Sequence, residues 1–288
     1  MKKERIFRHS LCLILCVVLL FSACPLPSRG VNDTWITNAA KELRGKMVER
    51  QAEIIFTYES PTWVFSPESL GDAPEAQELL HQETGRVMAR IYQEALAHTG
   101  VGYEGDYLQW HIKTCEERFS YSCVKVGDEM KDFVYTFQFN FTYYTTKAQE
   151  DAVTAKVQSV RSQLNLGGKS DYEKVKAIYD YLCGHVTYDN ANLNDPNYDL
   201  KFSAYAALIN GTSVCQGYSN LLYRLALEEG IDCRFIFGQS QGANHSWNIV
   251  KLGDVYYNVD ATWDTVTKNY SYFLKTDANM TDHTKDAE

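Results

Sequence analysis

A cysteine at the start of an amphipathic helical pattern constrains this chain more than any other feature. Within residues 212–219 (TSVCQGYS), Cys215 follows a loop that contains Gly211. Apolar residues then recur at helical spacing up to Gly230, which predicts a helix that begins at or near the cysteine. The unpaired N–H groups and the dipole at a helix N-terminus favour an anion and lower the pKa of a thiol. This stretch therefore predicts a reactive cysteine.

Two predicted strands supply a base and an acid that orients it. Residues 244–252 and 255–263 have the composition of β-strands, and the glycine–aspartate pair between them fits a tight hairpin turn. In a two-residue hairpin, His245 and Asp260 project from the same face as diagonal neighbours, so the carboxylate is able to hold the imidazole. Together with Cys215 they predict a Cys-His-Asp triad in which a thiolate is the nucleophile.

Three motifs occur in one order: VCQGYS around Cys215, HSWN beginning at His245, and NVDATWD around Asp260. In this order they resemble the transglutaminase-like (papain-like) superfamily, most closely its bacterial, exported branch. The resemblance covers residues 146–280 and implies an α+β fold in which a central helix bearing the cysteine packs on an antiparallel sheet. Animal transglutaminases carry Gln directly before the cysteine, whereas Val214 stands there in this chain. The resemblance therefore implies cysteine acyl transfer without specifying protein cross-linking.

The same resemblance implies an activity and a class of substrate. The expected protein is an enzyme that hydrolyses or transamidates amide bonds through a thioester, as a cysteine protease, amidase or transglutaminase-like acyltransferase. Its expected partners are exported proteins or cell-wall peptides, and no cofactor is expected. The alternative is a non-catalytic binding or scaffold module at the cell surface that retains the fold. An intact triad favours the enzyme, since a binding module has no need of all three residues.

Further residues are predicted to line the cleft. The backbone N–H of Cys215 is the expected oxyanion donor, and Gln216 and Tyr188 are candidates for a second donor. Trp247 and Trp263 are predicted to flank the cleft, with burial in the core as the alternative for both. A polar loop that begins after Tyr188 is long enough to form one wall.

The first 24 residues predict an export signal. A basic start precedes an apolar run that is too short for a comfortable membrane span, and small residues stand before Cys24. The sequence LFSAC also resembles a bacterial lipoprotein box. Two outcomes therefore stay open: lipidation of Cys24, which would anchor the protein to a membrane, and simple secretion. Either route exports the protein.

The charge of the chain excludes one class of partner. Its 37 acidic residues outnumber its 28 basic residues, giving a net charge of −9 without any basic cluster. Binding of nucleic acid depends on lysine and arginine side chains that neutralise phosphates. No nucleic-acid partner is therefore expected.

Beyond the export signal, the cysteines other than Cys215 and the remaining histidines are predicted to carry no catalytic chemistry. Cys115 and Cys123 flank a short stretch, and a disulfide between them is an alternative to two free thiols. Cys183 lies on an apolar helix face and Cys233 begins a strand, so both are expected to be inert. No C-x-x-C pair occurs and the histidines lack ligand partners, which predicts no metal site. His283, in a polar tail, is expected to be solvated.

Two domains are expected after the export signal. Residues 31–145 predict a small α+β domain, and residues 146–288 the catalytic domain. The first domain should contain helices over 35–47 and 73–98 and strands over 53–58, 107–124 and 131–144. Aromatic residues alternate strictly along the last of these strands, which predicts a packed inner face. The catalytic domain should open with two helices, the second capped by Ser170 and Glu173, and a short helix over 202–208 should precede the cysteine loop.

Overall fold

The computed structural model describes residues 6–9, 33–60, 74–126 and 129–286, and the chain divides into two compact units. The first unit contains residues 1–96 and 114–142, and the second contains residues 97–113 and 143–288. Cys24 lies outside the described residues, so export and lipidation stay predictions. The division differs from the predicted boundary at residue 145, because residues 97–113 belong to the second unit, where Tyr107 is part of the hydrophobic core.

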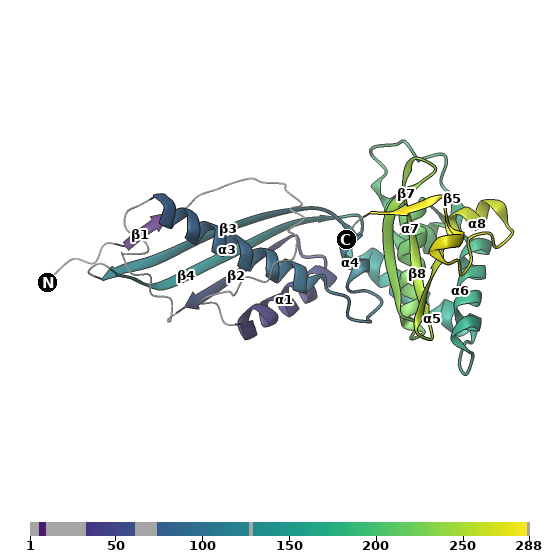
Figure 1. Ribbon diagram of the computed structural model, residues 1–288, viewed down its shortest axis with the longest axis horizontal. Coiled ribbons are helices and arrows are strands. Elements are labelled where there is room, and N and C mark those ends of the chain that lie inside the picture. The colour runs from purple at the N-terminus through teal and green to yellow at the C-terminus, as the bar shows by residue number, and fades with distance from the viewer. Residues whose placement is uncertain (1–5, 10–32, 61–73, 127–128, 287–288) are drawn as a thin grey trace. The chain divides into compact units, whose positions relative to one another are not determined.

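In its described residues, the first unit is an antiparallel sheet with two helices (Figure 1). Its elements are β1 (Ile6–His9), α1 (Asp33–Val48), β2 (Glu53–Ser60), α3 (Pro74–Ala95), β3 (Ile112–Val126) and β4 (Glu129–Tyr143), and the strand order is β1-β3-β4-β2. Trp35 of α1 and Tyr92 of α3 contact Phe137 and Phe139 of β4. The alternating aromatic residues of β4 are therefore buried between sheet and helices, which confirms the predicted inner face.

Two predicted elements were wrong in detail. The strand expected from residue 107 begins at Ile112, because residues Asp106–Gln109 form a short helix, α4. The buried carboxylate of Asp106 accepts hydrogen bonds from Arg234 and from the backbone N–H of Phe235, which ties this turn to the second unit's sheet. The helix expected over 202–208 is instead a 3₁₀ turn, η1 (Asp199–Phe202), followed by a π-helical turn, η2 (Ala206–Asn210).

The second unit is a four-stranded antiparallel sheet with helices packed on it. The helices are α5 (Lys147–Leu164), α6 (Asp171–His185), α7 (Cys215–Glu228) and α8 (Ala261–Thr267), besides a 3₁₀ turn, η3 (Asp277–Asn279). The sheet contains β7 (Cys233–Ser240), β8 (Ala243–Leu252), β9 (Val255–Val259) and β10 (His283–Lys285), in the order β10-β7-β8-β9. Two short strands, β5 (Thr187–Tyr188) and β6 (Thr212–Ser213), pair in parallel before α7. The predicted capping box of Ser170 and Glu173 is present at the start of α6.

Helix α7 is the central element of this unit. Its residues from Gly217 to Leu227 are buried, and the helix packs against β7, β8 and α6. Each large apolar side chain that it removes from water contributes roughly 1.5–3 kcal/mol. Because the cysteine is the first residue of this helix, the best-packed element of the unit fixes its position.

The hairpin of β8 and β9 confirms the predicted register and corrects its end. Leu252 pairs with Val255 across a two-residue turn, and Gly253 takes the positive φ of 60° that such a turn requires. The strand expected to run to residue 263 ends at Val259, because Asp260 caps helix α8.

Among the described residues, no helix is long and apolar enough to cross a membrane.

Candidate active site

Cys215 is partly exposed at the first position of α7. Its backbone N–H has no acceptor inside the helix, because the first N–H groups of a helix never do. The chain is very tightly packed just after it. A Cβ on Gly217 would lie 1.9 Å from the Ser213 Oγ and 2.6 Å from the Ser203 carbonyl oxygen, so only glycine fits in this first turn.

His245 projects from β8 and joins the cysteine to an acid. Its Nε2 lies 2.7 Å from Oδ2 of Asp260, which leaves Nδ1 as the ring nitrogen available to the thiol of Cys215. The thiol hydrogen-bonds His245, so the structure brings together the three residues of the predicted triad.

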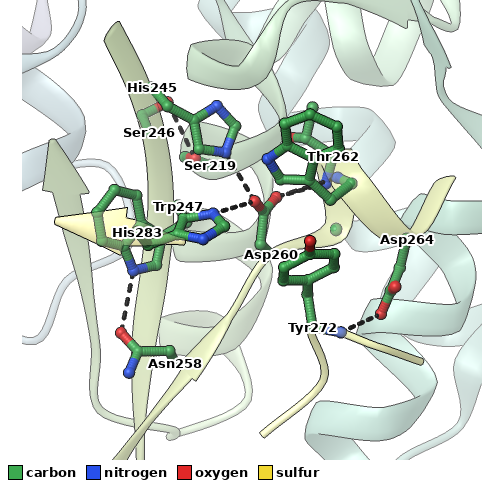
Figure 2. A network of polar contacts seen from close by, with 12 residues as sticks. Ser219, His245, Ser246, Trp247, Asn258, Asp260, Thr262, Asp264, Tyr272 and His283 are labelled. Atoms are coloured by element: carbon green, nitrogen blue, oxygen red, sulfur yellow. Dashed lines mark hydrogen bonds and ion pairs between the residues drawn. The ribbon is translucent and has the colours of Figure 1, made fainter. Parts of the chain in front are cut away.

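Asp260 is 1% exposed and is surrounded by donors. Its Oδ1 accepts the backbone N–H groups of Thr262 at 2.9 Å and Trp263 at 3.2 Å, as the N-cap of α8. Its Oδ2 faces two imidazoles, His245 and His283, as Figure 2 shows. Burial opposes the charged form, but the hydrogen bonds from both histidines lower the pKa of Asp260 below its usual value, so the carboxylate is ionised.

The ionised carboxylate of Asp260 influences the charge of both His245 and Cys215. Burial lowers the pKa of His245, but the hydrogen bonds to Asp260 and Cys215 outweigh it and raise that pKa to about 10. Burial likewise raises the pKa of the Cys215 thiol, and the bonds from His245 and Ser246 overcome this and lower it. Both shifts favour a thiolate beside an imidazolium, which is the nucleophilic form of a cysteine.

Sequence reasoning missed Ser246, which contacts the thiol, and Asn248, which joins β8 to α7. Ser246 hydrogen-bonds Cys215 through both its backbone and its side chain, and its Oγ accepts a bond from the Ser219 Oγ at 3.2 Å. The side-chain amide of Asn248 donates to the Ser219 carbonyl oxygen at 3.1 Å, which joins β8 to α7. The signal was present in the HSWN motif, in which every residue is buried.

The two predicted oxyanion donors differ in their surroundings. The Gln216 amide donates to the Trp110 carbonyl oxygen at 2.7 Å, so one of its two N–H groups is already bonded within the protein. Trp110 in turn stacks on Phe235, with ring centroids 4.5 Å apart, and forms an aromatic surface beside Gln216. Tyr188 lies close enough to Cys215 to sense its charge, which together with the larger effect of burial raises the pKa of this phenol to about 12. Its hydroxyl is therefore a neutral donor.

The two predicted cleft tryptophans also differ. Trp247 is 1% exposed, belongs to a core cluster and donates from Nε1 to the Asn258 Oδ1 at 3.0 Å, so burial is the correct alternative for it. Trp263 is partly exposed and its ring centroid lies 6.0 Å from that of His245. Trp263 is thus the tryptophan that flanks the histidine at the surface.

The expectation that His283 is solvated was wrong. Its side chain is 2% exposed, its Nε2 lies 3.1 Å from Oδ2 of Asp260, and its Nδ1 lies 2.9 Å from Oδ1 of Asp282. Strand β10 pairs along β7 and thereby carries this residue into the site. Three residues of strand in a polar tail leave no readable period, so sequence spacing gave no signal.

The expectation that the histidines lack ligand partners was also wrong for the group formed by His245, Asp260 and His283. Side-chain donor atoms of His245, Asp260 and His283 lie within 4.8 Å of one another. Both imidazoles lie at hydrogen-bond distance from Oδ2 of Asp260. Hydrogen bonds from the two ring N–H groups to this oxygen explain why the three side chains lie together.

The polar loop after Tyr188 is held by a buried cation. Lys201 is 4% exposed, and its ammonium donates to the carbonyl oxygens of Asn192 at 2.7 Å, Leu193 at 3.0 Å and Asp195 at 2.7 Å. Three carbonyl acceptors match the three N–H donors of a lysine. This loop therefore has a defined conformation next to the strand that bears Tyr188.

The remaining described cysteines contrast with Cys215. Burial raises the pKa of Cys183 to about 12 and that of Cys233 well above its usual value, as expected for inert thiols. Cys115 and Cys123 lie on one continuous strand, β3, and no disulfide joins them. Eight residues of extended chain separate them by about 26 Å, which is far beyond the reach of a disulfide.

Comparisons with known proteins concern the same part of the chain. Residues 158–261 match the family model described as the transglutaminase-like superfamily, which confirms the resemblance read from the motifs. The chain is 29% identical over 139 residues to human kyphoscoliosis peptidase, and 26% identical over 149 residues to the mouse protein. These matches cover 42% and 46% of this chain but only 21% and 22% of those proteins, so the chain spans about a fifth of their length.

Two solved structures are also similar. A transglutaminase crystal structure aligns with 21% identity and a TM-score of 0.35, covering 50% of this chain and 44% of the other. A provisionally assigned cysteine protease from Cytophaga hutchinsonii aligns with 14% identity and a TM-score of 0.31, covering 62% of this chain and 75% of the other.

Proposed function

We propose that this transglutaminase-like superfamily protein is a cysteine-dependent acyl-transfer enzyme that cleaves amide bonds through a thioester on Cys215. One observation carries the proposal: a thiol at a helix N-terminus hydrogen-bonds an imidazole that is itself held by a buried carboxylate. The name of the human relative, a peptidase, supports the same class of bond.

The proposed first half-reaction acylates the cysteine. The thiolate of Cys215 attacks the amide carbonyl carbon, and the electron pair of the C=O bond moves to the oxygen. The backbone N–H of Cys215 is positioned to stabilise that oxyanion, with the neutral hydroxyl of Tyr188 as a second donor. The C–N bond then breaks as the imidazolium of His245 gives its proton to the leaving amine, which leaves an S-acyl enzyme.

The second half-reaction releases the acyl group. His245, now neutral, takes a proton from water as the water oxygen attacks the thioester carbon, and the products are a carboxylic acid and free thiol. An amine in place of water gives a new amide. Asp260 stays ionised throughout and orients the imidazole. We favour hydrolysis, because Cys215 is partly exposed and water reaches the thioester.

Export would place this chemistry on protein or cell-wall peptide substrates, at the cell surface if Cys24 is lipidated. The mass of the mature N-terminus distinguishes the lipidated form from the free one. The partly exposed Trp110, stacked on Phe235 and Phe237 near Cys215, would offer an aromatic surface to the acyl side of such a peptide. The alternative function, a binding module without catalysis, requires that the thiol stay unacylated.

p-Nitrophenyl acetate tests the proposal without knowledge of the natural substrate. We expect a burst of nitrophenol and a protein that gains one acetyl group, assigned to Cys215 by peptide mass spectrometry. Addition of glycine methyl ester then separates the two outcomes, since a transamidase makes the acetylated amine and a hydrolase releases acetate. Acetylation spread over surface lysines with none on Cys215 would favour the binding module.

A further inference from the structure

The C-terminal strand β10 delivers a second imidazole to the acid of the proposed triad. His283 and His245 both contact Oδ2 of Asp260, at 3.1 and 2.7 Å, and their ring centroids are 5.3 Å apart (Figure 2). A Cys-His-Asp mechanism requires only one of these histidines. The second is nevertheless almost fully buried, at the cost of its hydration.

We propose that His283 is a positioning residue, which through Asp260 keeps the Cys215–His245 pair ionised and so makes the reactivity of Cys215 depend on docking of β10. This inference rests on the proposed function, because it concerns the same thiolate. It assigns a role to the polar C-terminal tail, which neither the motifs nor the fold otherwise explain.

Asp260 receives hydrogen bonds on both of its carboxylate oxygens. A fully buried carboxylate is costly unless hydrogen bonds satisfy its oxygens. Oδ1 is satisfied by the start of helix α8, and Oδ2 by the two imidazoles. Loss of His283 would leave His245 as the one side-chain donor to this oxygen among the described residues, so protons would compete for the carboxylate at higher pH.

His283 is itself held in place. Its Nδ1 contacts Asp282, whose other carboxylate oxygen accepts the Tyr272 hydroxyl at 2.7 Å. The titratable groups that face its ring are therefore Asp260, His245, Asp282 and Tyr272, and the apolar neighbour is Trp247. This chain of contacts orients Nε2 toward the triad's acid.

A glycine of β7 makes room for strand β10. Gly238 of β7 pairs with Lys285 on one side and with His245 on the other. A Cβ on Gly238 would lie 2.1 Å from the Thr284 carbonyl oxygen, and its three closest atoms all belong to β10. The substitution Gly238→Ala should therefore displace β10 from the sheet while leaving β8 in place.

The test is the rate of alkylation of Cys215 by iodoacetamide as a function of pH, read by peptide mass spectrometry in buffers that contain EDTA. In His283→Leu, we expect the acid limb of the profile to move to higher pH, because Asp260 has lost a charge-stabilising donor. At the pH of half-maximal wild-type reactivity, the rate should fall about tenfold, as is typical for the loss of one hydrogen bond to a charged group. His283→Gln, whose amide donates one N–H, should restore most of the wild-type profile.

Gly238→Ala examines the same proposal without altering a titratable group. We expect it to shift the acid limb as His283→Leu does, and the double variant to show no further shift. Gly184→Ala is the matched control, because nothing lies within 4 Å of a Cβ there and its profile should equal that of the wild type.

The outcomes separate the two proposals. An unshifted profile in His283→Leu, or a rate reduced equally at every pH together with a lower melting temperature, would overturn the role of His283 and leave the proposed function intact. An ordinary thiol titration in the wild-type protein would instead overturn the proposed function itself.

Discussion

Cys215→Ala is expected to abolish turnover of amide and ester substrates, with a loss in kcat of at least about four orders of magnitude. The reason is that the variant has no atom on which an acyl group can be held. The fold should survive, because the side chain is partly exposed at a helix start and alanine is accepted there. Initial rates with p-nitrophenyl acetate and with peptide anilides measure the loss.

Cys183→Ala is the matched control for that experiment. Cys183 belongs to the same unit, but burial raises the pKa of its thiol to about 12, so it has no thiolate to contribute. We expect near wild-type turnover from this variant. Turnover by Cys215→Ala within tenfold of the wild type would show that another group carries the chemistry.

Asp260→Asn is expected to lower kcat on the order of a thousandfold or more, as for the equivalent change in serine hydrolases. The geometry makes this substitution selective. The side-chain oxygen must stay at the Oδ1 position to cap α8 through Thr262 and Trp263, so the new NH₂ group faces His245 and His283. The NH₂ group then faces the N–H groups of both imidazoles, and no acceptor lies between them. The His245 imidazole loses its orientation and also the negative charge that keeps it protonated.

The helix cap in Asp260→Asn should persist, because asparagine is among the best N-cap residues. A thermal melt is therefore expected to show a much smaller effect than the kinetics do. Asp254→Asn, in the exposed hairpin turn, is the matched control and should change neither. A kcat for Asp260→Asn within a few-fold of the control would mean that the carboxylate serves only to cap the helix.

The parts of the site that could be predicted are those fixed by local pattern. The hairpin register followed from a glycine-containing two-residue turn, and the helix start at Cys215 followed from apolar spacing. Asp260 was placed beside His245 for a partly wrong reason, since it reaches the imidazole as a helix cap and not as a strand residue. The three motifs carried the resemblance to the transglutaminase-like superfamily, whose family model matches residues 158–261.

The parts that could not be predicted depend on contacts between distant segments. Residues 106–109 look like the start of a strand, and they form a turn because Asp106 binds Arg234 far along the chain. His283 lies in a tail whose three-residue strand forms only because Gly238 leaves space on β7. No local period encodes either contact, and propensity is overridden by such tertiary pairing.

The proposed function depends on a thiolate–imidazolium pair, and the pH dependence of Cys215 alkylation in the wild type and in His245→Ala shows whether the pair exists. The lowered pKa of Cys215 keeps the thiolate present below its usual range, and the imidazolium persists until the pH rises to about 10, so alkylation should be fast across the neutral range and fall on the acid side. In His245→Ala the thiol should titrate at or above its ordinary value of about 8.5, because burial then raises its pKa without opposition from the imidazole. A wild-type thiol that already titrates there, unchanged by His245→Ala, would contradict the account.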